Sequence, residues 1–379
     1  MKRHANISLR ALLCASVFGG VLPAAAAAQD ITIDDARTTQ VGLGAGETVT
    51  ITETGSITTA GRVINLSTTG TGTATLVNRG RIESTSTTTL TSTIGPASPI
   101  SLNLTNESGA SITGARAVYF TTGELINRGT IASTMTGTST GDAINAGQDS
   151  IVRLESGSVT SASSATTGAS YAVNFTGGGN SIYIDTGATV NGTIRAATGG
   201  VGANRVYLTG TGTQTLGPIS GFNGYYIDSG DWTVTSSITA AAEGSTIAEG
   251  ATLRWGNGGA TGSISGNVVN NGRLIVNRTN QVVGFTTASI TGTGQLIVDS
   301  PGAAGGLTLR APGTSYSGDT IVKNGTFSGV ATNAMSASSE VVLESAGILD
   351  IVTGFDQEIG GLSGVGATNI NGAALTLGG

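Results

Sequence analysis

The 379-residue sequence is poor in charge, aromatic rings, proline, cysteine and histidine. Charged residues make up 11% of it and aromatic residues 4%, with 6 prolines, 1 cysteine and 1 histidine. Because its 61 glycines come with so few prolines, the composition argues against collagen and against proline-rich disorder. The single cysteine excludes a disulfide framework, so packing and backbone hydrogen bonds must hold the fold together.

The N-terminal segment has the parts of a secretory signal peptide. Basic residues from Lys2 to Arg10 open it, and the apolar stretch 11–21 is too short to span a bilayer as a helix. An alanine run follows Pro23 and ends in a site of the A-x-A kind. We therefore predict a signal peptide over residues 1–28 that is cleaved after Ala28.

The predicted cleavage removes His4 and Cys14, so the mature chain has neither residue type. Such a chain cannot build a Ser-His-Asp triad, a Cys-His dyad or a zinc site containing histidine. We predict no catalytic residues, no cofactor and no metal site. Three of the 17 basic residues lie in the signal peptide, which leaves 14 against 23 acidic ones. This acidic balance argues against a nucleic-acid partner.

Short runs of alternating polarity recur between glycines along the whole chain. Examples are TVTIT at 48–52, SIYID at 181–185 and QLIVD at 295–299, and this alternation predicts β-strands. Longer stretches also repeat: ATLVNRGRIEST at 74–85 resembles TGELINRGTIAST at 122–134. Glycines that follow such runs recur every 20 to 31 residues. This period, without helical stripes, predicts an all-β solenoid of about 14 turns, at ~4.8 Å per turn.

The Asn-Arg-Gly stretches predict the corners of this solenoid. A chain that rounds a corner needs residues at positive φ, which asparagine and glycine adopt at least cost. After each corner an isoleucine, Ile82 or Ile131, is expected to re-enter the core, while the corner arginines face solvent. The predicted structural turn residues are Asn78, Gly80, Asn127, Gly129, Asn271, Gly272, Gly318 and Gly325.

The stretch LTLRAPGTSYSGDTIVKNGTF at 307–327 resembles the passenger-associated β-strand repeat of bacterial autotransporters. The residues that match that pattern are Leu307, Leu309, Gly313, Tyr316, Gly318, Thr320, Val322, Gly325 and Phe327. Phe327 and Asp319 depart from it mildly. The resemblance is strongest over residues 228–350.

The resemblance implies a right-handed parallel β-helix passenger over residues 29–379. It also implies export through the periplasm by the type V pathway, to the surface or surroundings of a Gram-negative bacterium. Such proteins normally end in a C-terminal β-barrel, and no segment of this sequence has the ~10-residue alternating strands with aromatic girdles that a barrel requires. An outer-membrane translocator barrel is therefore expected as a partner that is missing from this chain or separately encoded.

The leading functional interpretation is a secreted or surface-displayed structural and adhesive scaffold, with possible cell-surface or glycan ligands. Tyr225, Tyr226, Trp232 and Trp255 are the candidate aromatics for stacking on sugars, although such residues more often pack against a corner. A carbohydrate-active β-helix enzyme is the first alternative, because clustered carboxylates can cleave glycosidic bonds.

The carboxylate pairs that would serve such an enzyme are Asp228 with Asp231 and Asp34 with Asp35. The second alternative is a surface-layer type of protein exported without a barrel. An acidic cluster in a groove would favour the enzyme, and a smooth rod would favour adhesion.

Overall fold

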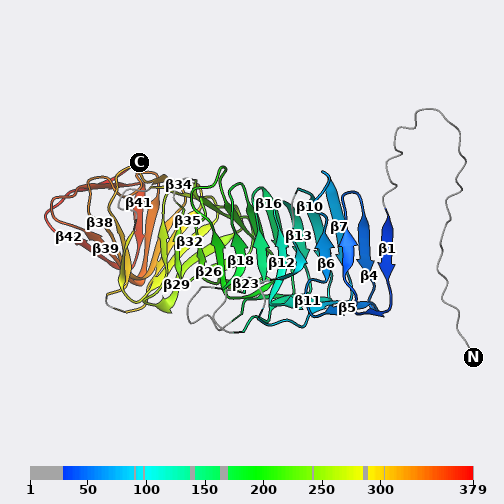
Figure 1. Ribbon diagram of the computed structural model, residues 1–379. Coiled ribbons are helices and arrows are strands. Elements are labelled where there is room, and N and C mark those ends of the chain that lie inside the picture. Colours follow the sequence, from blue (N-terminus) through cyan, green and yellow to red (C-terminus); the bar gives the residue numbers. More distant parts are fainter. Residues whose placement is uncertain are drawn as a thin grey trace, which may run out of the picture.

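The computed structural model describes residues 29–88, 91–96, 99–136, 141–162, 170–240, 243–284, 289–302 and 304–378. The predicted signal peptide and its cleavage site at Ala28 lie outside these residues. The described chain forms an elongated rod whose strands run across the long axis (Figure 1). It is a parallel β-solenoid of about 15 turns without a helix, which confirms the predicted all-β solenoid with one turn more than expected. In the described part of the chain, no helix long and apolar enough to cross a membrane is found.

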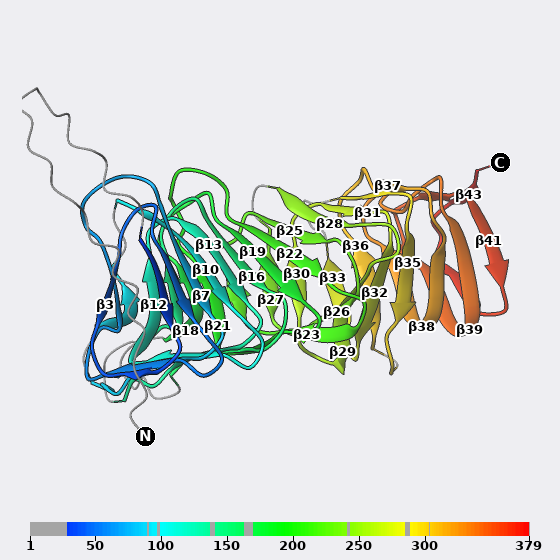
Figure 2. The same ribbon diagram turned by 90° about the vertical axis from the view of Figure 1, so that its right-hand side faces the viewer.

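Sheet A is a 13-stranded parallel sheet that follows the rod for most of its length. Figure 2 shows its strands following one another from β7 to β37. Its strands in spatial order are β1 (Asp30–Ile33), β4 (Thr48–Ile51), β7 (Thr73–Asn78), β10 (Ser101–Asn106), β13 (Gly123–Asn127), β16 (Ser150–Leu154), β19 (Ser181–Asp185), β22 (Arg205–Thr209), β25 (Gly224–Ile227), β28 (Gly244–Ile247), β31 (Val268–Asn270), β34 (Ile290–Gly292) and β37 (Ser315–Tyr316).

Two further sheets complete the wall in the N-terminal part of the rod. Sheet B contains β2 (Ala36–Arg37), β5 (Ser56–Thr59), β8 (Arg81–Ser84), β11 (Ser111–Gly114), β14 (Thr130–Ser133), β17 (Ser158–Thr160) and β20 (Thr189–Asn191). Sheet C contains β3 (Val41–Leu43), β6 (Ile64–Leu66), β9 (Ser92–Gly95), β12 (Arg116–Phe120), β15 (Ile144–Ala146), β18 (Tyr171–Phe175), β21 (Thr193–Ala196) and β24 (Ile219–Ser220).

Sheet D replaces sheet B from β23 onward. Its strands are β23 (Thr213–Leu216), β26 (Asp231–Val234), β29 (Thr252–Gly259), β32 (Arg273–Arg278), β35 (Gln295–Asp299), β38 (Thr320–Gly329), β36 (Gly306–Leu309), β33 (Gln281–Gly284), β39 (Glu340–Ile351), β41 (Gly361–Gly364) and β42 (Ala367–Ile370). Two short pairs join β27 (Ser237–Thr239) to β30 (Ser263–Ser265) and β40 (Gln357–Ile359) to β43 (Leu375–Leu377).

The core is a column of mainly aliphatic side chains inside these walls, with a few buried aromatic rings. Successive side chains of a strand point to opposite faces, so each short alternating run puts every second residue inside. In β10, for example, Leu102, Leu104 and Asn106 are buried. Ile82 and Ile131, predicted to re-enter the core after a corner, are fully buried. Burial of one such side chain contributes about 1.5–3 kcal/mol, and stacked turns add these contributions along the rod.

The asparagines of the two Asn-Arg-Gly stretches, Asn78 and Asn127, point into the core and form a ladder with Asn106, which lies between them. Asn78, Asn106 and Asn127 face one another in register on β7, β10 and β13, and all are fully buried. Asn78 Nδ2 donates to Asn106 Oδ1 at 2.8 Å, and Asn106 Nδ2 donates to Asn127 Oδ1 at 2.8 Å. Because each amide is paired with the next, the ladder satisfies groups whose burial alone would cost free energy.

The positive-φ explanation of the corners is wrong for most of the predicted glycines. Within the described chain, positive φ is absent at Gly80, Gly129, Gly272 and Gly318 and is present at Gly325, where φ is 86°. Asn78, Asn127 and Asn271 do not have positive φ either.

The glycines are needed for a different reason, which is the close approach of consecutive turns. A Cβ on Gly80 would lie 2.1 Å from the carbonyl oxygen of Gly55, and one on Gly318 would lie 2.3 Å from that of Gly294. The chain therefore needs a residue without a side chain where one turn passes directly over the next.

The corner predicted at Asn271 and Gly272 lies in the stretch VVNNGRLIV at 268–276 and uses a different asparagine from the one predicted. Asn270 is fully buried, pairs with Ile247 on β28 and donates through Nδ2 to the backbone oxygen of Gln295 at 2.9 Å. Asn271 lies outside the core, and its Oδ1 accepts the amide of Thr293 at 3.2 Å. Asn270 stands two residues before Gly272, as Asn78 and Asn127 stand before Gly80 and Gly129, and is therefore their equivalent.

The stretch 307–327, which resembles the passenger-associated β-strand repeat, forms part of the core at the C-terminal end. Tyr316 and Phe327 are fully buried. The Tyr316 hydroxyl pairs with Thr320 Oγ1, which also lies 2.9 Å from Ser339 Oγ. Burial raises the pKa of Tyr316 to about 12. The tyrosine and threonine of the motif therefore form a buried hydroxyl cluster between turns.

Candidate functional site

Three of the four aromatics proposed for sugar stacking are in the core. Tyr225 and Trp255 are 1% exposed and Trp232 is 0% exposed. The indole of Trp232 donates to the backbone oxygen of Ser229 at 3.1 Å and is fixed in place. The prediction that these three rings meet a ligand is wrong, because inward-facing strand positions place them inside the rod. Only Tyr226 lies on the outer face.

Tyr226 belongs to a column of stacked tyrosines on the outer face of sheet A. Strand register aligns Tyr183 on β19, Tyr207 on β22 and Tyr226 on β25. The ring centroids of Tyr183 and Tyr207 are 4.5 Å apart with an interplanar angle of 9°, and those of Tyr207 and Tyr226 are 4.9 Å apart at 16°. The spacing follows from the ~4.8 Å separation of parallel strands. We call Tyr183, Tyr207 and Tyr226 the tyrosine column.

Arginine closes one end of this column. Arg153 on β16 occupies the next position in register, and its Cζ lies 4.1 Å from the centroid of the Tyr183 ring. Arg153 Nε also donates to Glu124 Oε1 at 2.6 Å. Since Arg153 covers one face of Tyr183 and Tyr207 covers the other, the ring presents only its edge and hydroxyl outward.

An ion pair brackets the other end of the column. Arg205 donates to Glu243 from Nε at 2.8 Å and from its terminal nitrogen at 2.6 Å, and the Tyr226 hydroxyl lies 3.0 Å from Glu243 Oε2. The Arg205 hydrogen bond lowers the pKa of Glu243. Burial, followed by the nearby Glu243 carboxylate, raises the pKa of Tyr226.

The corner beside sheet A carries a chain of alternating charges. Arg128 donates to Glu107 Oε2 at 3.0 Å and to Glu155 Oε2 at 2.7 Å, across three successive turns. The hydrogen bond to Glu107 is the main cause that raises the pKa of Arg128. The Arg128 side chain is 35% exposed, so it is a corner arginine at the surface that also links neighbouring turns.

The aspartates proposed for catalysis do not form one cluster. On the outside of sheet D, Arg254 donates two hydrogen bonds to Asp231, from Nε to Oδ1 at 2.9 Å and from a terminal nitrogen to Oδ2 at 2.8 Å. Asp35 pairs with Arg37 at 3.1 Å at the far end of the rod. Asp228 is exposed, and desolvation raises its pKa. Among the described residues, no three His, Cys, Asp or Glu side chains come together as a metal-binding group.

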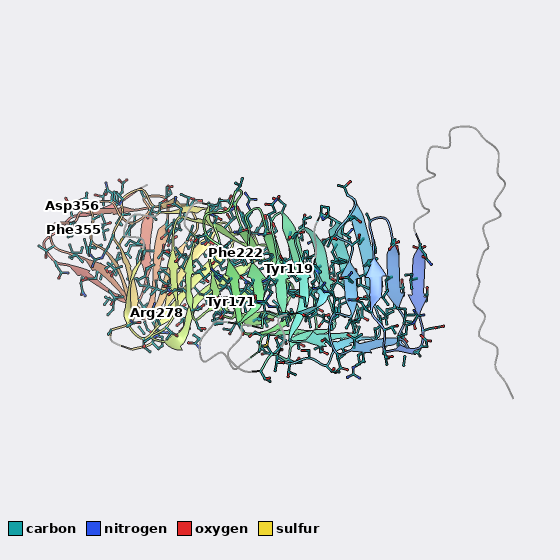
Figure 3. All side chains as sticks on the ribbon, viewed as in Figure 1. Tyr119, Tyr171, Phe222, Arg278, Phe355 and Asp356 are labelled. Carbon is teal, nitrogen blue, oxygen red and sulfur yellow. The ribbon has the colours of Figure 1, made fainter. Side chains whose placement is uncertain are left out.

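Sheet C carries a separate polar cluster around Asp142, which is 3% exposed. Its carboxylate accepts Nδ2 of Asn145 at 3.0 Å, Nδ2 of Asn174 at 2.9 Å and the amide of Tyr171 at 2.9 Å. Figure 3 labels Tyr171 of this cluster on the middle part of the rod, together with Tyr119, which lies on β12 two strands away in the same sheet. Asn145 lies on β15, whereas Asn174 and Tyr171 lie on β18. The cluster therefore joins adjacent turns of sheet C.

Sequence reasoning missed Tyr183, Tyr207 and Arg153 as parts of one site. A signal was present, since Tyr183 and Tyr207 each lie at the third position of an alternating strand, as in SIYID, and Arg153 lies at the fourth position of SIVRL. Their spacing of 30, 24 and 19 residues up to Tyr226 varies with turn length, so only the strand register shows that they are neighbours.

Comparison with known proteins gives one informative similarity. The chain is 38% identical over 119 residues to the adhesin BmaC autotransporter of Brucella suis biovar 1 (strain 1330). This region is 29% of the chain but only 3% of the adhesin, so the match covers a small part of that protein. No family profile and no solved structure matches the chain. The similarity and the β-solenoid together fit an autotransporter passenger.

Proposed function

We propose that this chain is a passenger that is secreted or displayed on the surface of a Gram-negative bacterium and acts as an elongated adhesive scaffold. The observation that carries the proposal is the continuous solenoid, in which sheet A alone joins 13 strands in parallel. Every turn bonds to its neighbours, so the rod can hold surface residues at a distance from its point of attachment. The similarity to an autotransporter adhesin supports the same function.

The outer surface suits many weak contacts. On sheet B, outward positions are mainly short polar side chains, such as Ser111, Thr130 and Ser158 in register. Such a surface gives little affinity at a single point, but many copies on one cell act together. Export through the periplasm and an outer-membrane β-barrel translocator are parts of this proposal.

Display on a cell with matched controls tests the proposal. The chain is fused to an autotransporter translocator in a Gram-negative host, and protease accessibility of whole cells measures surface exposure. We expect the displaying cells to adhere to epithelial layers or glycan-coated surfaces more than cells that carry the translocator alone. Equal adhesion by the two strains, with the chain shown to be exposed, would contradict the adhesive function.

A further inference from the structure

A shallow pocket lies beside the tyrosine column, where sheet A meets its corner. Its volume is about 340 Å³, close to the lower limit of small-ligand sites. The lining comes from three successive turns and consists of Arg153, Leu154, Glu155, Tyr183, Asp185 and Thr209.

The two carboxylates of this pocket stand on adjacent turns. Leu154 and Ile184 are aligned in the sheet, and Glu155 and Asp185 are the residues that follow them. The two carboxylate residues are therefore one strand spacing apart, ~4.8 Å. Glu155 uses Oε2 for Arg128 at 2.7 Å, and Asp185 uses Oδ1 for the amide of Gly187 at 2.9 Å. Each carboxylate is thereby fixed in position and has its other oxygen available to accept a hydrogen bond.

Donors line the same pocket. Arg153 engages Glu124 through Nε and lies over the Tyr183 ring, and its guanidinium has five N–H groups, more than these contacts use. Thr209 contributes a hydroxyl whose contact with the Ile184 backbone oxygen is 3.4 Å. The edge and hydroxyl of Tyr183 complete the wall, because both faces of its ring are covered.

The charge of the pocket selects against anions. The charge of Arg153 is matched by Glu124, and that of Arg128 is shared by Glu107 and Glu155. Asp185 forms no ion pair with the described residues. The pocket therefore carries surplus negative charge, which repels carboxylated or sulfated ligands and suits neutral groups that donate hydrogen bonds.

We propose that this pocket binds a neutral hexopyranose unit of a glycan. Vicinal sugar hydroxyls donate to Asp185 and Glu155, and Arg153 donates to a sugar oxygen, while the ring lies against the edge of Tyr183. The inference rests on the proposed adhesive function and names its ligand class. A shallow site of this kind binds one sugar weakly, and dense display of the rod raises the avidity.

Saturation-transfer NMR on the purified chain tests the site, with the methyl glycosides of glucose, galactose and mannose as probes and methyl glucuronide as the anionic comparison. We expect binding of at least one neutral glycoside in the millimolar range and weaker binding of the glucuronide. Asp185→Asn keeps an oxygen for the Gly187 amide, and we expect it to weaken binding about tenfold or more, since it removes a hydrogen bond to a charged acceptor. Glu155→Gln should act in the same direction.

Glu83→Gln, on the outer face of sheet B, is the matched control and should leave binding unchanged. Circular dichroism melts establish that the variants are folded, and Asp185→Asn decides the result if Glu155→Gln is unstable. The proposal is overturned if no neutral glycoside binds, if Asp185→Asn binds like the unaltered chain, or if the glucuronide binds best. Calcium binding that depends on Asp185, without sugar binding, would also overturn it.

The adhesion assay separates this inference from the proposed function. Cells that adhere while the purified chain binds none of the neutral glycosides would preserve the adhesive function and refute the sugar site. Sugar binding that depends on Asp185, with no adhesion by displaying cells, would preserve the site and refute the adhesive function.

Discussion

The N-terminal and C-terminal parts of the rod fill the same column with different side chains. From β1 to β21, sheets A, B and C enclose a mainly aliphatic core, with Phe120 and Phe175 as its large buried rings and a ladder of buried asparagines, Asn78, Asn106 and Asn127. From β23 onward sheet D replaces sheet B, and the core receives Trp232 and Trp255. Sheet A is common to both parts. The cross-section of a solenoid can therefore change as long as one backbone ladder continues from turn to turn.

Removal of an indole should have the largest effect, and only in the C-terminal part. We expect Trp232→Ala to lower the free energy of unfolding of the surrounding turns by about 3–5 kcal/mol, because it leaves a large cavity. Hydrogen exchange of β25–β29 measures the loss. Leu125→Ala in the N-terminal part is the control. If this variant lost as much protection at β25–β29, the two parts of the rod would not unfold independently.

The second prediction distinguishes two reasons for glycine. A Cβ on Gly129 would lie 2.4 Å from the carbonyl oxygens of Ala110 and Glu107, whereas Gly109 has open space and a φ of 81°. We expect Gly129→Ala to cost about 3 kcal/mol through overpacking and Gly109→Ala about 1–2 kcal/mol through its left-handed backbone. Urea denaturation compares the two variants, and a larger loss for Gly109→Ala would refute the close-approach explanation.

The third prediction concerns the asparagine ladder, a feature of the N-terminal part. Asn106→Ala removes the central amide and leaves a buried donor of Asn78 without its partner. We expect a loss of about 2–3 kcal/mol in the free energy of unfolding. Asn103, which is exposed on the same strand, provides the control, and Asn103→Ala should change stability by less than about 0.5 kcal/mol. Similar values for the two variants would mean that the ladder does not stabilise the fold.

The smallest expected effect is at the Arg205–Glu243 pair, near the junction of the two parts. The folded-state pKa of Glu243 is lowered, so its contribution is present above the unfolded pKa of ~4.3 and is lost as pH falls through the folded value. An exposed pair of this kind stabilises by at most about 1 kcal/mol. Thermal melts of Glu243→Gln and the unaltered chain should differ at pH 7 and converge in acid. A difference in melting temperature that grows as the pH falls would contradict this prediction.

Much of the backbone architecture followed from local sequence. Alternating runs such as SIYID predict strands because side chains of a strand point to opposite faces, and recurrent glycines predict turns. The role of Gly80 was not predictable in the same way, because its φ is ordinary and its constraint is the carbonyl oxygen of Gly55 on the preceding turn. Likewise, the aromatic residues between 225 and 255 were predicted together as candidates for stacking on sugars, yet Tyr225 and Tyr226 face opposite sides of sheet A.

The sequence by itself determined that this chain is all-β, builds repeated turns, and has a core of aliphatic residues with few charges. These features depend on backbone propensity and on the polarity of near neighbours. Only the tertiary structure decided which residues from different turns meet: Tyr183 with Tyr207, Arg128 with Glu107 and Glu155, and Asn78 with Asn106. The reason is physical, because turns differ in length, and the hydrogen-bond register between strands, rather than spacing along the chain, sets every lateral contact.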